Sequence, residues 1–269
     1  MSRSIGILGC GWLGFPLAKT LMAHNYEVYG TTTSGEKMEP MDQAGIQPYK
    51  IALHPDKIVG DIDGFLARVN HLVINVPPRL RKINAESYVD KMKLLHSKIL
   101  QSNIQNIIFV SSTSVYGNIA HEITESTAPQ PLTESGRQLL ICEALFQNTV
   151  SLNTTVIRFG GLIGPGRHPV TMLSKKRGLS NGNDPINLIH LEDCIHIIQT
   201  VLEKRYWNEM FNAVYPYHPT KEEYYTQEAL KRGIPAPIYA STSGENIKGI
   251  VKSRNFINKK HTFYTSIVS

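Results

Sequence analysis

The fold is decided by residues 4–23, which read SIGILGCGWLGFPLAKTLMA. Ser4 to Leu8 is a short apolar run of the kind that forms a buried strand. A glycine-rich turn, Gly9 to Gly14, leads into an apolar-periodic stretch from Phe15 to Asn25 that predicts a helix. Pro16 is tolerated in the first turn of that helix because its missing N–H would have no intrahelical partner. A strand, a glycine-rich turn and a helix in this order are the first half of a βαβ unit.

The same alternation continues along the chain and predicts a parallel sheet. In Ala85–Gln101, for example, Tyr88, Met92, Leu95 and Ile99 recur with a helical period. The other expected strands are Glu27–Thr31, Tyr49–Leu53, His71–Val76, Ile104–Ser111 and Thr154–Phe159, and the other expected helices are Glu134–Asn148 and Asp193–Lys204. We therefore predict an α/β fold with a doubly wound, Rossmann-type parallel sheet.

After Gly160 the pattern loosens, because glycine and proline punctuate a loop and the later residues are richer in tyrosine and proline. We expect residues 1–160 to form the sheet domain, completed by later segments. Residues 161–269 are expected to form a small C-terminal α/β cap, interleaved with the final sheet elements. This cap should cover the carboxyl edge of the sheet, where open α/β folds bind ligands. Asp193 is interpreted as the N-cap of the helix that follows it.

Composition excludes several classes of protein. The chain has 269 residues, a formal net charge of +6 and three cysteines without metal-ligand or CxxC spacing. We therefore expect no metal site, no disulfide framework and a cytoplasmic location. The chain contains no run of 18 apolar residues, so the sequence predicts no membrane-spanning helix. Two basic stretches, Pro165–Asn183 and Asn246–Ser269, contain no acidic residue. They favour an anionic ligand and a solvated surface about equally.

The glycine-rich turn carries the pattern GxGxxG at Gly9, Gly11 and Gly14, between a strand and a helix, which predicts dinucleotide binding. A free adenosine ribose 2′-hydroxyl would favour an acidic residue at the end of the second strand. This chain instead has hydroxyl side chains from Thr31 to Ser34, with Lys37 close by. The sequence therefore favours NADP over NAD.

At this point the chain resembles the extended and atypical short-chain dehydrogenase/reductases, specifically the NAD-dependent epimerase/dehydratase-like group. Besides GxGxxG, the resemblance rests on Val110-Ser-Ser-Thr-Ser-Val-Tyr-Gly117, on Arg158-Phe-Gly-Gly-Leu-Ile-Gly-Pro-Gly-Arg167 and on Asn187-Leu-Ile-His-Leu-Glu-Asp193. These segments occur in the family's order over nearly 200 residues. The resemblance implies cofactor contacts from Gly9, Cys10, Gly11, Trp12, Leu13, Gly14, Thr31, Thr32, Thr33, Ser34, Asn75, Val76, Pro77, Ser111, Phe159, Gly160 and Gly161.

The family's catalytic residues are incomplete in this chain. The resemblance implies a Ser or Thr that holds the substrate hydroxyl, and Ser112 matches it. It also implies a Tyr-x-x-x-Lys pair followed four residues later by Glu, which Glu143 matches. Counting back from Glu143 places Leu139 at the Lys position and Ser135 at the Tyr position. An aliphatic hydroxyl is too weak an acid to replace a phenol with a pKa of about 10.

Two residues are candidates to replace the missing pair. Tyr116 is the nearest phenol in sequence, and we name it with Ser112 as a catalytic candidate. A structural or substrate-lining role for Tyr116 is the stronger alternative. Arg137 offers a positive charge in place of the Lys, or it is a solvated helix residue.

The loops expected at the carboxyl edge carry basic residues suited to a phosphate or carboxylate. Arg167 is the strongest candidate substrate contact among the arginines, Arg79 and Arg81 are weaker ones, and His190 is a further candidate. We predict an NAD(P)-dependent oxidoreductase or epimerase/dehydratase for a small polar or nucleotide-linked substrate. The alternative is a noncatalytic NADP-binding redox sensor or regulatory scaffold. A homodimer is left open, and neither a membrane nor a nucleic acid is expected as a partner.

Overall fold

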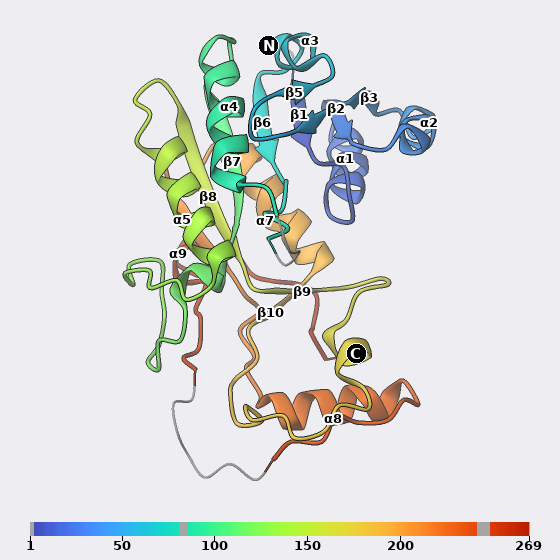
Figure 1. Ribbon diagram of the computed structural model, residues 1–269, viewed down its shortest axis with the longest axis vertical. Coiled ribbons are helices and arrows are strands. Elements are labelled where there is room, and N and C mark those ends of the chain that lie inside the picture. Colours follow the sequence, from blue (N-terminus) through green and yellow to red (C-terminus); the bar gives the residue numbers. More distant parts are fainter. Residues whose placement is uncertain (1–2, 81–84, 241–247, 269) are drawn as a thin grey trace. The chain divides into compact units, whose positions relative to one another are not determined.

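The computed structural model describes residues 3–80, 85–240 and 248–268 (Figure 1). Within them, seven strands form the main sheet in the order β11-β8-β7-β6-β1-β2-β3. They are β1 (Ser4–Leu8), β2 (Glu27–Thr32), β3 (Gln47–Lys50), β6 (His71–Ile74), β7 (Asn106–Ser112), β8 (Asn153–Phe159) and β11 (Met210–Ala213). The pairs β1–β2, β1–β6, β2–β3 and β6–β7 are parallel.

The order of this sheet confirms the predicted doubly wound fold. β2 and β3 extend the sheet on one side of β1, and β6 and β7 extend it on the other. The direction of winding therefore reverses between β1 and β6. Open α/β sheets bind ligands beyond the carboxyl ends of their strands at such a switch point. The glycine-rich turn follows β1 and thus lies at the predicted place.

The chain divides into two compact units, and the division does not follow a single cut in the sequence. Unit 1 holds the described residues up to Ser112, together with Thr133–Ile157 and Ile197–Met210. Unit 2 holds Thr113–Leu132, Arg158–His196 and the described residues from Phe211 onward. The boundary passes through β8 and β11, so the predicted limit at residue 160 comes directly after a strand shared by both units.

Unit 1 consists of strands and helices that follow the sequence pattern closely. In α4, Tyr88, Met92, Leu95 and Ile99 form the buried face. Ser87 begins this helix, because its hydroxyl accepts a hydrogen bond from the Asp90 N–H. α4 and α5 lie side by side (Figure 1). The helices are α1 (Gly14–Ala23), α2 (Met38–Gln43), α3 (Ile62–Ala67), α4 (Tyr88–Leu100), α5 (Glu134–Gln147) and the second half of α7 (Leu191–Lys204).

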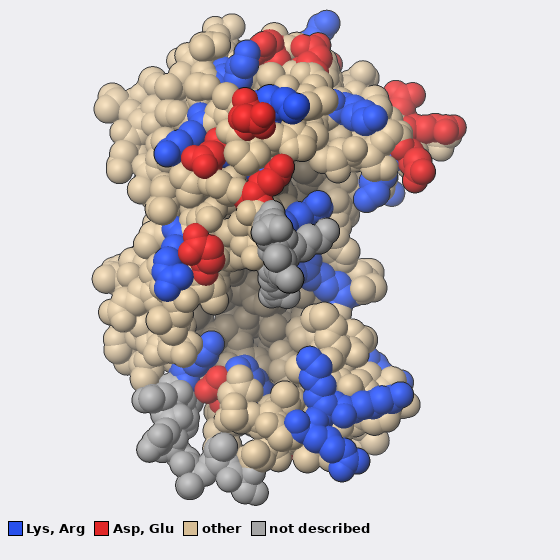
Figure 2. Space-filling view, viewed as in Figure 1, with Lys and Arg blue, Asp and Glu red and all other residues tan. Residues whose placement is uncertain are grey.

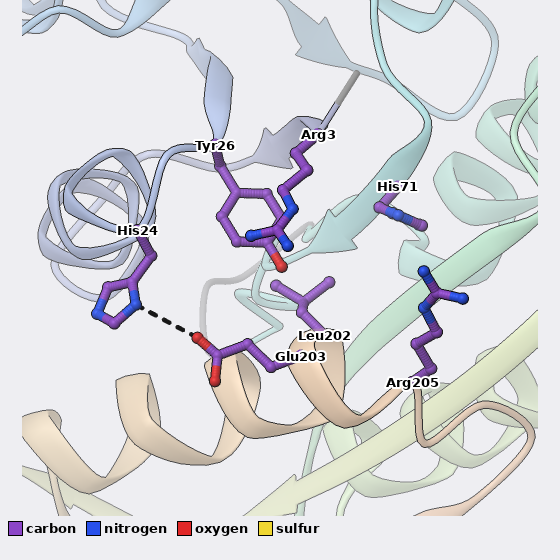
Figure 3. A pocket seen from close by; sticks show the side chains of 7 residues that line it. All are labelled: Arg3, His24, Tyr26, His71, Leu202, Glu203 and Arg205. Atoms are coloured by element: carbon purple, nitrogen blue, oxygen red, sulfur yellow. Dashed lines mark ion pairs between the residues drawn. The ribbon is translucent and has the colours of Figure 1, made fainter. Parts of the chain in front are cut away.

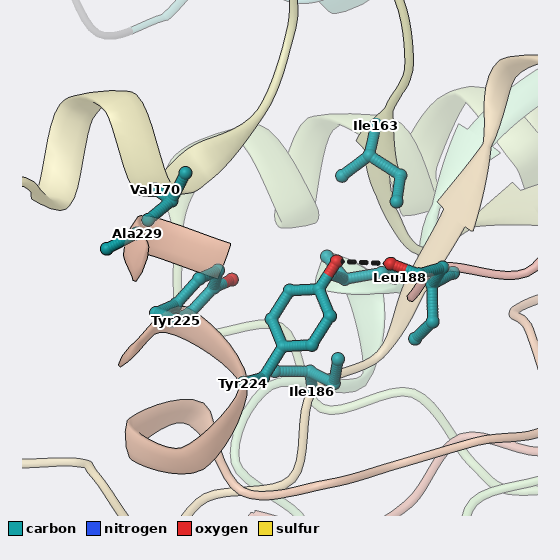
Figure 4. Close-up of a cluster of buried hydrophobic side chains, with 8 residues drawn as sticks. Ile163, Val170, Ile186, Leu188, Tyr224, Tyr225 and Ala229 are labelled. Atoms are coloured by element: carbon teal, nitrogen blue, oxygen red, sulfur yellow. Dashed lines mark hydrogen bonds between the residues drawn. The ribbon is translucent and has the colours of Figure 1, made fainter. Parts of the chain in front are cut away.

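Unit 2 has shorter elements around a core of its own. Tyr224 lies at the centre of an apolar cluster with Ile163, Val170, Ile186 and Leu188 (Figure 4). None of the helices in the described part of either unit is long and apolar enough to cross a membrane. The elements of unit 2 are β9 (Gly161–Ile163), β10 (Leu188–His190), α6 (Pro169–Leu173), α8 (Lys221–Lys231), α9 (Arg254–Asn258) and the 3-10 helix η2 (Thr113–Tyr116).

Two local predictions were wrong. The expected strand Tyr49–Leu53 is divided, because β3 ends at Lys50 and β4 (Ala52–Leu53) pairs antiparallel with β5 (Ile58–Val59). Asp193 is not an N-cap. It lies inside the first turn of α7, is fully buried and accepts hydrogen bonds from the backbone N–H groups of Tyr264 and Thr265. Its carboxylate therefore holds the C-terminal segment of unit 2.

Candidate functional site

The glycine-rich turn places three glycines in three different environments. Gly9 has φ +106°, and a Cβ there would lie 2.7 Å from the Asn75 carbonyl oxygen. A Cβ on Gly14 would overlap the Gly9 carbonyl oxygen. A Cβ on Gly11 would meet no atom within 4 Å. Gly9 and Gly14 are therefore required by the packing of the turn, whereas Gly11 leaves open space above it.

Two polar side chains hold this turn in position. The Gly9 N–H donates to Thr31 Oγ1 over 2.9 Å, and Asn75 Nδ2 donates to the Gly9 carbonyl over 3.0 Å. The Cys10 N–H also donates to the Thr31 carbonyl over 2.8 Å. Because β2 and the end of β6 both bind the turn, its shape is fixed by hydrogen bonds within the protein. Thr31 and Asn75 thus act on a ligand by shaping the turn.

The other residues of the turn differ in how far they are exposed to solvent. Cys10 and Leu13 are buried, so only their backbone can meet a ligand. Burial raises the pKa of the Cys10 thiol to about 12, so the thiol stays neutral. Trp12 is half-buried, and Gly11 is exposed. No side chain caps α1, and its first turn holds no acidic residue, which leaves the positive end of the helix available to an anion.

The end of β2 shows which hydroxyls face solvent. Thr31 and Thr32 are buried, and the Ser34 N–H donates to Thr32 Oγ1 over 3.2 Å. Thr33 is exposed and Ser34 is half-buried. Lys50 ends the neighbouring strand β3, in register with Thr32. Its Nζ lies 3.8 Å from the position of a Cβ on Gly35, so a cation stands beside this loop.

The segment after β6 combines a fixed start with an exposed end. The Val76 carbonyl accepts a hydrogen bond from the buried Tyr88 hydroxyl over 2.9 Å. Pro77 and Arg79 are exposed, and Arg79 has φ +54°. Arg81 lies outside the described residues. The Asn75 amide is therefore the part of this segment that reaches the glycine turn.

The end of β7 carries two serines with different surroundings. Ser111 is buried, and its hydroxyl donates to Glu143 Oε1 on α5 over 2.5 Å. This contact ties α5 to the end of β7. Ser112 is the last residue of β7 and is half-buried. Ser112 is thus the more accessible of the two hydroxyls.

Ser135 and Leu139, which the resemblance places at the family's Tyr and Lys positions, lie on α5. Neither side chain can act as the acid or base of that pair. Leu139 is buried in the interior of unit 1 and Ser135 is half-buried in the first turn. Arg137 is exposed and pairs with Glu134 over 3.5 Å at helical spacing. This pairing favours the solvated role that the sequence left open for Arg137.

Tyr116 lies in a filled interior within unit 2. Its side chain is 1% exposed, and the Arg158 guanidinium stacks over its ring, 4.9 Å from the centroid. The hydroxyl accepts a hydrogen bond from Arg158 Nη1 over 2.9 Å and also contacts Asn212 Oδ1 at 2.8 Å and the Thr124 carbonyl at 3.1 Å. Burial raises the pKa of Tyr116 against the opposing effect of Arg158. These contacts favour a structural role over a catalytic one.

The backbone after β8 is engaged in the packing of unit 2. The Gly160 N–H donates to the Ala213 carbonyl and the Gly161 N–H donates to the Asn187 carbonyl. Phe159 is buried. These N–H groups are therefore engaged inside unit 2, and the predicted cofactor contacts of residues 159–161 stay predictions.

Arg167 and His190 also belong to unit 2. Arg167 is exposed and closes a tight turn in which its N–H donates to the Gly164 carbonyl. His190 Nδ1 accepts a hydrogen bond from the Glu192 N–H over 3.3 Å. Lys175, Lys176 and Arg177 of the predicted basic stretch are exposed, and Figure 2 shows Lys and Arg side chains gathered over the α8 region.

Sequence reasoning missed Lys50. This residue ends a strand 18 residues after Thr32, so only the strand pairing brings it to the end of β2. The predicted strand Tyr49–Leu53 placed Lys50 near its start, so no signal in the sequence pointed to it. The predicted cofactor contact of Asn75 stays a prediction, and the structure adds that its amide donates to the Gly9 carbonyl. Among the described residues, no group of three or more His, Cys, Asp or Glu side chains is suited to a metal.

Comparisons with known proteins match most of this chain. The sequence model of the family described as "NAD dependent epimerase/dehydratase family" matches residues 5–213. The chain is 32% identical over 259 residues to Protein YeeZ of Escherichia coli strain K12, which covers 96% of this chain and 94% of the relative.

Solved structures with low sequence identity share the fold. The UDP-Glc/GlcNAc 4-epimerase from Campylobacter jejuni is 13% identical with a TM-score of 0.81, covering 98% of this chain and 95% of that one. MoeE5 in complex with UDP-glucuronic acid and NAD is 17% identical with a TM-score of 0.79, at the same coverage of both chains.

Proposed function

Since the chain belongs to the NAD-dependent epimerase/dehydratase family, we propose that its glycine turn binds a nicotinamide dinucleotide for oxidoreductase or epimerase/dehydratase chemistry. The observation that carries the proposal is the open space above Gly11, within a turn that hydrogen bonds otherwise fix. A pyrophosphate needs close approach to backbone N–H groups at this position. The residues of the turn fit this group, because only Gly11 is free of the packing that requires Gly9 and Gly14.

The proposed cofactor is NADP, with NAD less favoured. The end of β2 offers the exposed Thr33 and half-buried Ser34 hydroxyls, and Lys50 stands beside the same loop. A cation and hydroxyl donors suit a 2′-phosphate better than a 2′-hydroxyl. When bound, the nicotinamide ring would accept or donate a hydride.

The proposed substrate is small and polar or nucleotide-linked. MoeE5 was solved with UDP-glucuronic acid and NAD, and the Campylobacter jejuni protein is a UDP-Glc/GlcNAc 4-epimerase. We carry that substrate class to this chain as part of the proposal. Arg79, Arg167 and His190 stay candidate substrate contacts, because guanidinium groups bind phosphate oxygens in bidentate fashion.

Ser112 is the proposed catalytic residue for orienting the substrate. Ser112 ends β7 and is only half-buried, and a serine hydroxyl is suited to hydrogen-bond a substrate hydroxyl or carbonyl oxygen. Tyr116 is not carried into the proposed reaction, because its hydroxyl is engaged inside unit 2. Without the Tyr-x-x-x-Lys pair, we expect slow turnover, since general acid–base catalysis contributes about 10²–10⁴-fold. The homodimer and the cytoplasmic location stay predictions.

The alternative function is a noncatalytic NADP-binding redox sensor or regulatory scaffold. The observation that favours it is Leu139, which fills the family's Lys position with a buried aliphatic side chain. A protein of this kind needs the glycine turn but no acid or base. The two functions therefore share cofactor binding and differ in turnover.

Calorimetric titration of NADP⁺ and NAD⁺ into the wild type and the Gly11→Val variant tests the shared part. The Cβ of the new side chain enters open space, so we expect the melting temperature to stay unchanged. The isopropyl group should block the pyrophosphate and weaken binding about a hundredfold. Ala120→Val, at an exposed position outside the turn, is the matched control. Equal affinity of Gly11→Val and wild type would overturn the proposed site, and tighter binding of NAD⁺ than NADP⁺ would overturn the cofactor preference.

Incubation with UDP-glucose and saturating cofactor distinguishes the two functions. Absorbance detects reduced cofactor if the sugar is oxidised, and NMR of the anomeric proton detects a new epimer. The wild type should turn over the substrate slowly, and Ser112→Ala should lose turnover while cofactor affinity is retained. Tight cofactor binding without turnover across a panel of UDP-sugars would favour the sensor.

A further inference from the structure

Apart from the glycine turn, unit 1 has a cavity of about 340 Å³ at the amino ends of the parallel strands (Figure 3). Arg3 immediately precedes β1, Tyr26 precedes β2 and His71 is the first residue of β6. The glycine turn follows the carboxyl end of β1, so β1 separates the two places. The full lining is Arg3, His24, Tyr26, His71, Leu202, Glu203 and Arg205.

Two guanidinium groups face this cavity without a carboxylate partner. Within residues 3–80, 85–240 and 248–268, neither Arg3 nor Arg205 forms an ion pair. Arg3 stacks over the Tyr26 ring, 5.7 Å from its centroid, which limits the positions the guanidinium can take. Arg205 follows the end of α7 with φ +53°. In Figure 3 both side chains extend into the space between β1 and α7.

The single acidic residue of the lining is already engaged. Glu203 Oε1 lies 3.3 Å from His24 Nδ1, on the side of the cavity away from His71 (Figure 3). Glu203 therefore does not neutralise both arginines. The lining keeps an excess of positive charge, which is the condition for attracting an anion.

His71 supplies a further nitrogen. Its Nδ1 is buried and has no hydrogen-bond partner among the described residues, and the residue lines the cavity. The ring stacks on Trp207 at 5.4 Å and 23°, which fixes its orientation. Burial lowers the pKa of His71, and the nearby Arg205 lowers it further. An anion bound between the arginines would oppose both effects.

We propose that this cavity binds the phosphate group of a small phosphorylated molecule, held by Arg3 and Arg205 and contacted by His71. Two guanidinium groups match the oxygens of a phosphate, and each forms charge-assisted hydrogen bonds. The volume is within the range of small-molecule pockets, so there is room for an organic group beside the phosphate. The proposal does not depend on the dinucleotide site, because its residues lie at the opposite ends of the strands.

Calorimetry with inorganic phosphate and with AMP, at constant ionic strength, tests the site. The Gly11→Val protein is used, so that neither probe is counted at the glycine turn. Arg3→Gln and Arg205→Gln should each weaken phosphate binding about tenfold. Lys204→Gln removes an equal charge from an exposed neighbour outside the lining, and it should leave the affinity unchanged.

The two probes and a second readout complete the test. Tighter binding of AMP than of phosphate supports a ligand with an organic group, and equal binding supports recognition of the phosphate alone. Phosphate should also raise the NMR titration midpoint of His71, assigned through the His71→Gln variant, and should not do so in Arg205→Gln. Unchanged affinity in both arginine variants, or equal weakening by Lys204→Gln, would overturn the proposal.

Discussion

The glycine turn of unit 1 and the Tyr116 cluster of unit 2 are both family signatures in the sequence, but they differ in how their space is used. Above Gly11 there is no atom within 4 Å of the Cβ position. Around Tyr116, Arg158 and Asn212 occupy both the ring face and the hydroxyl. The first signature leaves open space beside Gly11, whereas the second is filled by the protein.

A motif that matches a family pattern therefore does not by itself show whether its residues bind a ligand or pack inside the protein. Packing requires glycine at Gly9 and Gly14 but not at Gly11, although all three belong to one motif. The buried Tyr116 hydroxyl of unit 2 has hydrogen-bond partners within the protein, which makes its burial compatible with its polarity. Each of the following predictions changes one region and leaves the other as its reference.

Gly14→Ala should have the largest effect, because the new methyl group would overlap the Gly9 carbonyl oxygen. Backbone atoms fixed by hydrogen bonds cannot move aside easily, so we expect a loss of about 3–5 kcal/mol in the free energy of unfolding. Urea denaturation followed by circular dichroism measures this loss. Gly11→Ala is the matched control, with the same added methyl group in open space. Equal stability of the two variants would contradict the assignment of Gly14 to packing.

The histidine network of unit 2 should make stability depend on pH. The Val170 N–H donates to His168 Nδ1 over 3.2 Å, and His168 Nε2 lies 3.0 Å from the Tyr224 hydroxyl, which donates to the Ile267 carbonyl over 2.7 Å. A ring that accepts at Nδ1 and donates at Nε2 is neutral. Burial, aided by Arg232, lowers the pKa of His168 to about 4, against the opposing effect of Glu228.

Because the unfolded state takes up the proton near pH 6.5 and the folded state only near pH 4, stability should be complete above pH 6.5 and fall as pH decreases to about 4. Near pH 4 the free energy of unfolding should be lower by about 2–3 kcal/mol. Urea denaturation of the wild type and of His168→Gln across this range isolates the contribution, since other titrating groups are common to both. Parallel stability curves for the two proteins would contradict it.

The sequence predicted unit 1 better than unit 2, and the physical reason lies in the elements themselves. β1 was predicted from its short apolar run. The buried face of α4 was predicted from periodicity, because a long helix repeats its apolar residues over several turns. The predicted helix over 193–204 agrees with α7 except for its first two residues. The doubly wound class of the sheet followed from the βαβ pattern, which leaves few topologies for a parallel sheet.

The short elements of unit 2 could not be predicted from periodicity. β9 and β10 have three residues each, and their pairing joins Gly161 to Leu188 across 27 positions. Asp193 looked like an N-cap because the hydrogen bonds it accepts come from residues more than 70 positions later. In the same way, only the fold reveals that Tyr116 is enclosed and that Lys50 stands at the end of β2.

Tyr116→Phe should lower stability and leave the cofactor site intact. Removing the hydroxyl leaves Arg158 Nη1 and Asn212 Oδ1 with one partner fewer, so we expect a loss of about 1–2 kcal/mol. Denaturation measures the loss, and calorimetry with NADP⁺ should give wild-type affinity. If turnover of UDP-glucose is found, it should also be unchanged in this variant. A variant of full stability that loses turnover would restore Tyr116 as a catalytic residue.

The smallest effect is expected at Lys50, which stands beside the loop that follows β2 in unit 1. Lys50→Gln removes the charge beside the loop that follows β2, so NADP⁺ should bind about fivefold more weakly while the affinity for NAD⁺ is unchanged. The effect is modest because Lys50 is exposed and its charge is screened by solvent. Lys37→Gln is the matched control, since Lys37 is the basic residue that the sequence alone suggested. If Lys37→Gln weakens NADP⁺ binding and Lys50→Gln does not, the local sequence identifies the phosphate contact better than the strand pairing does.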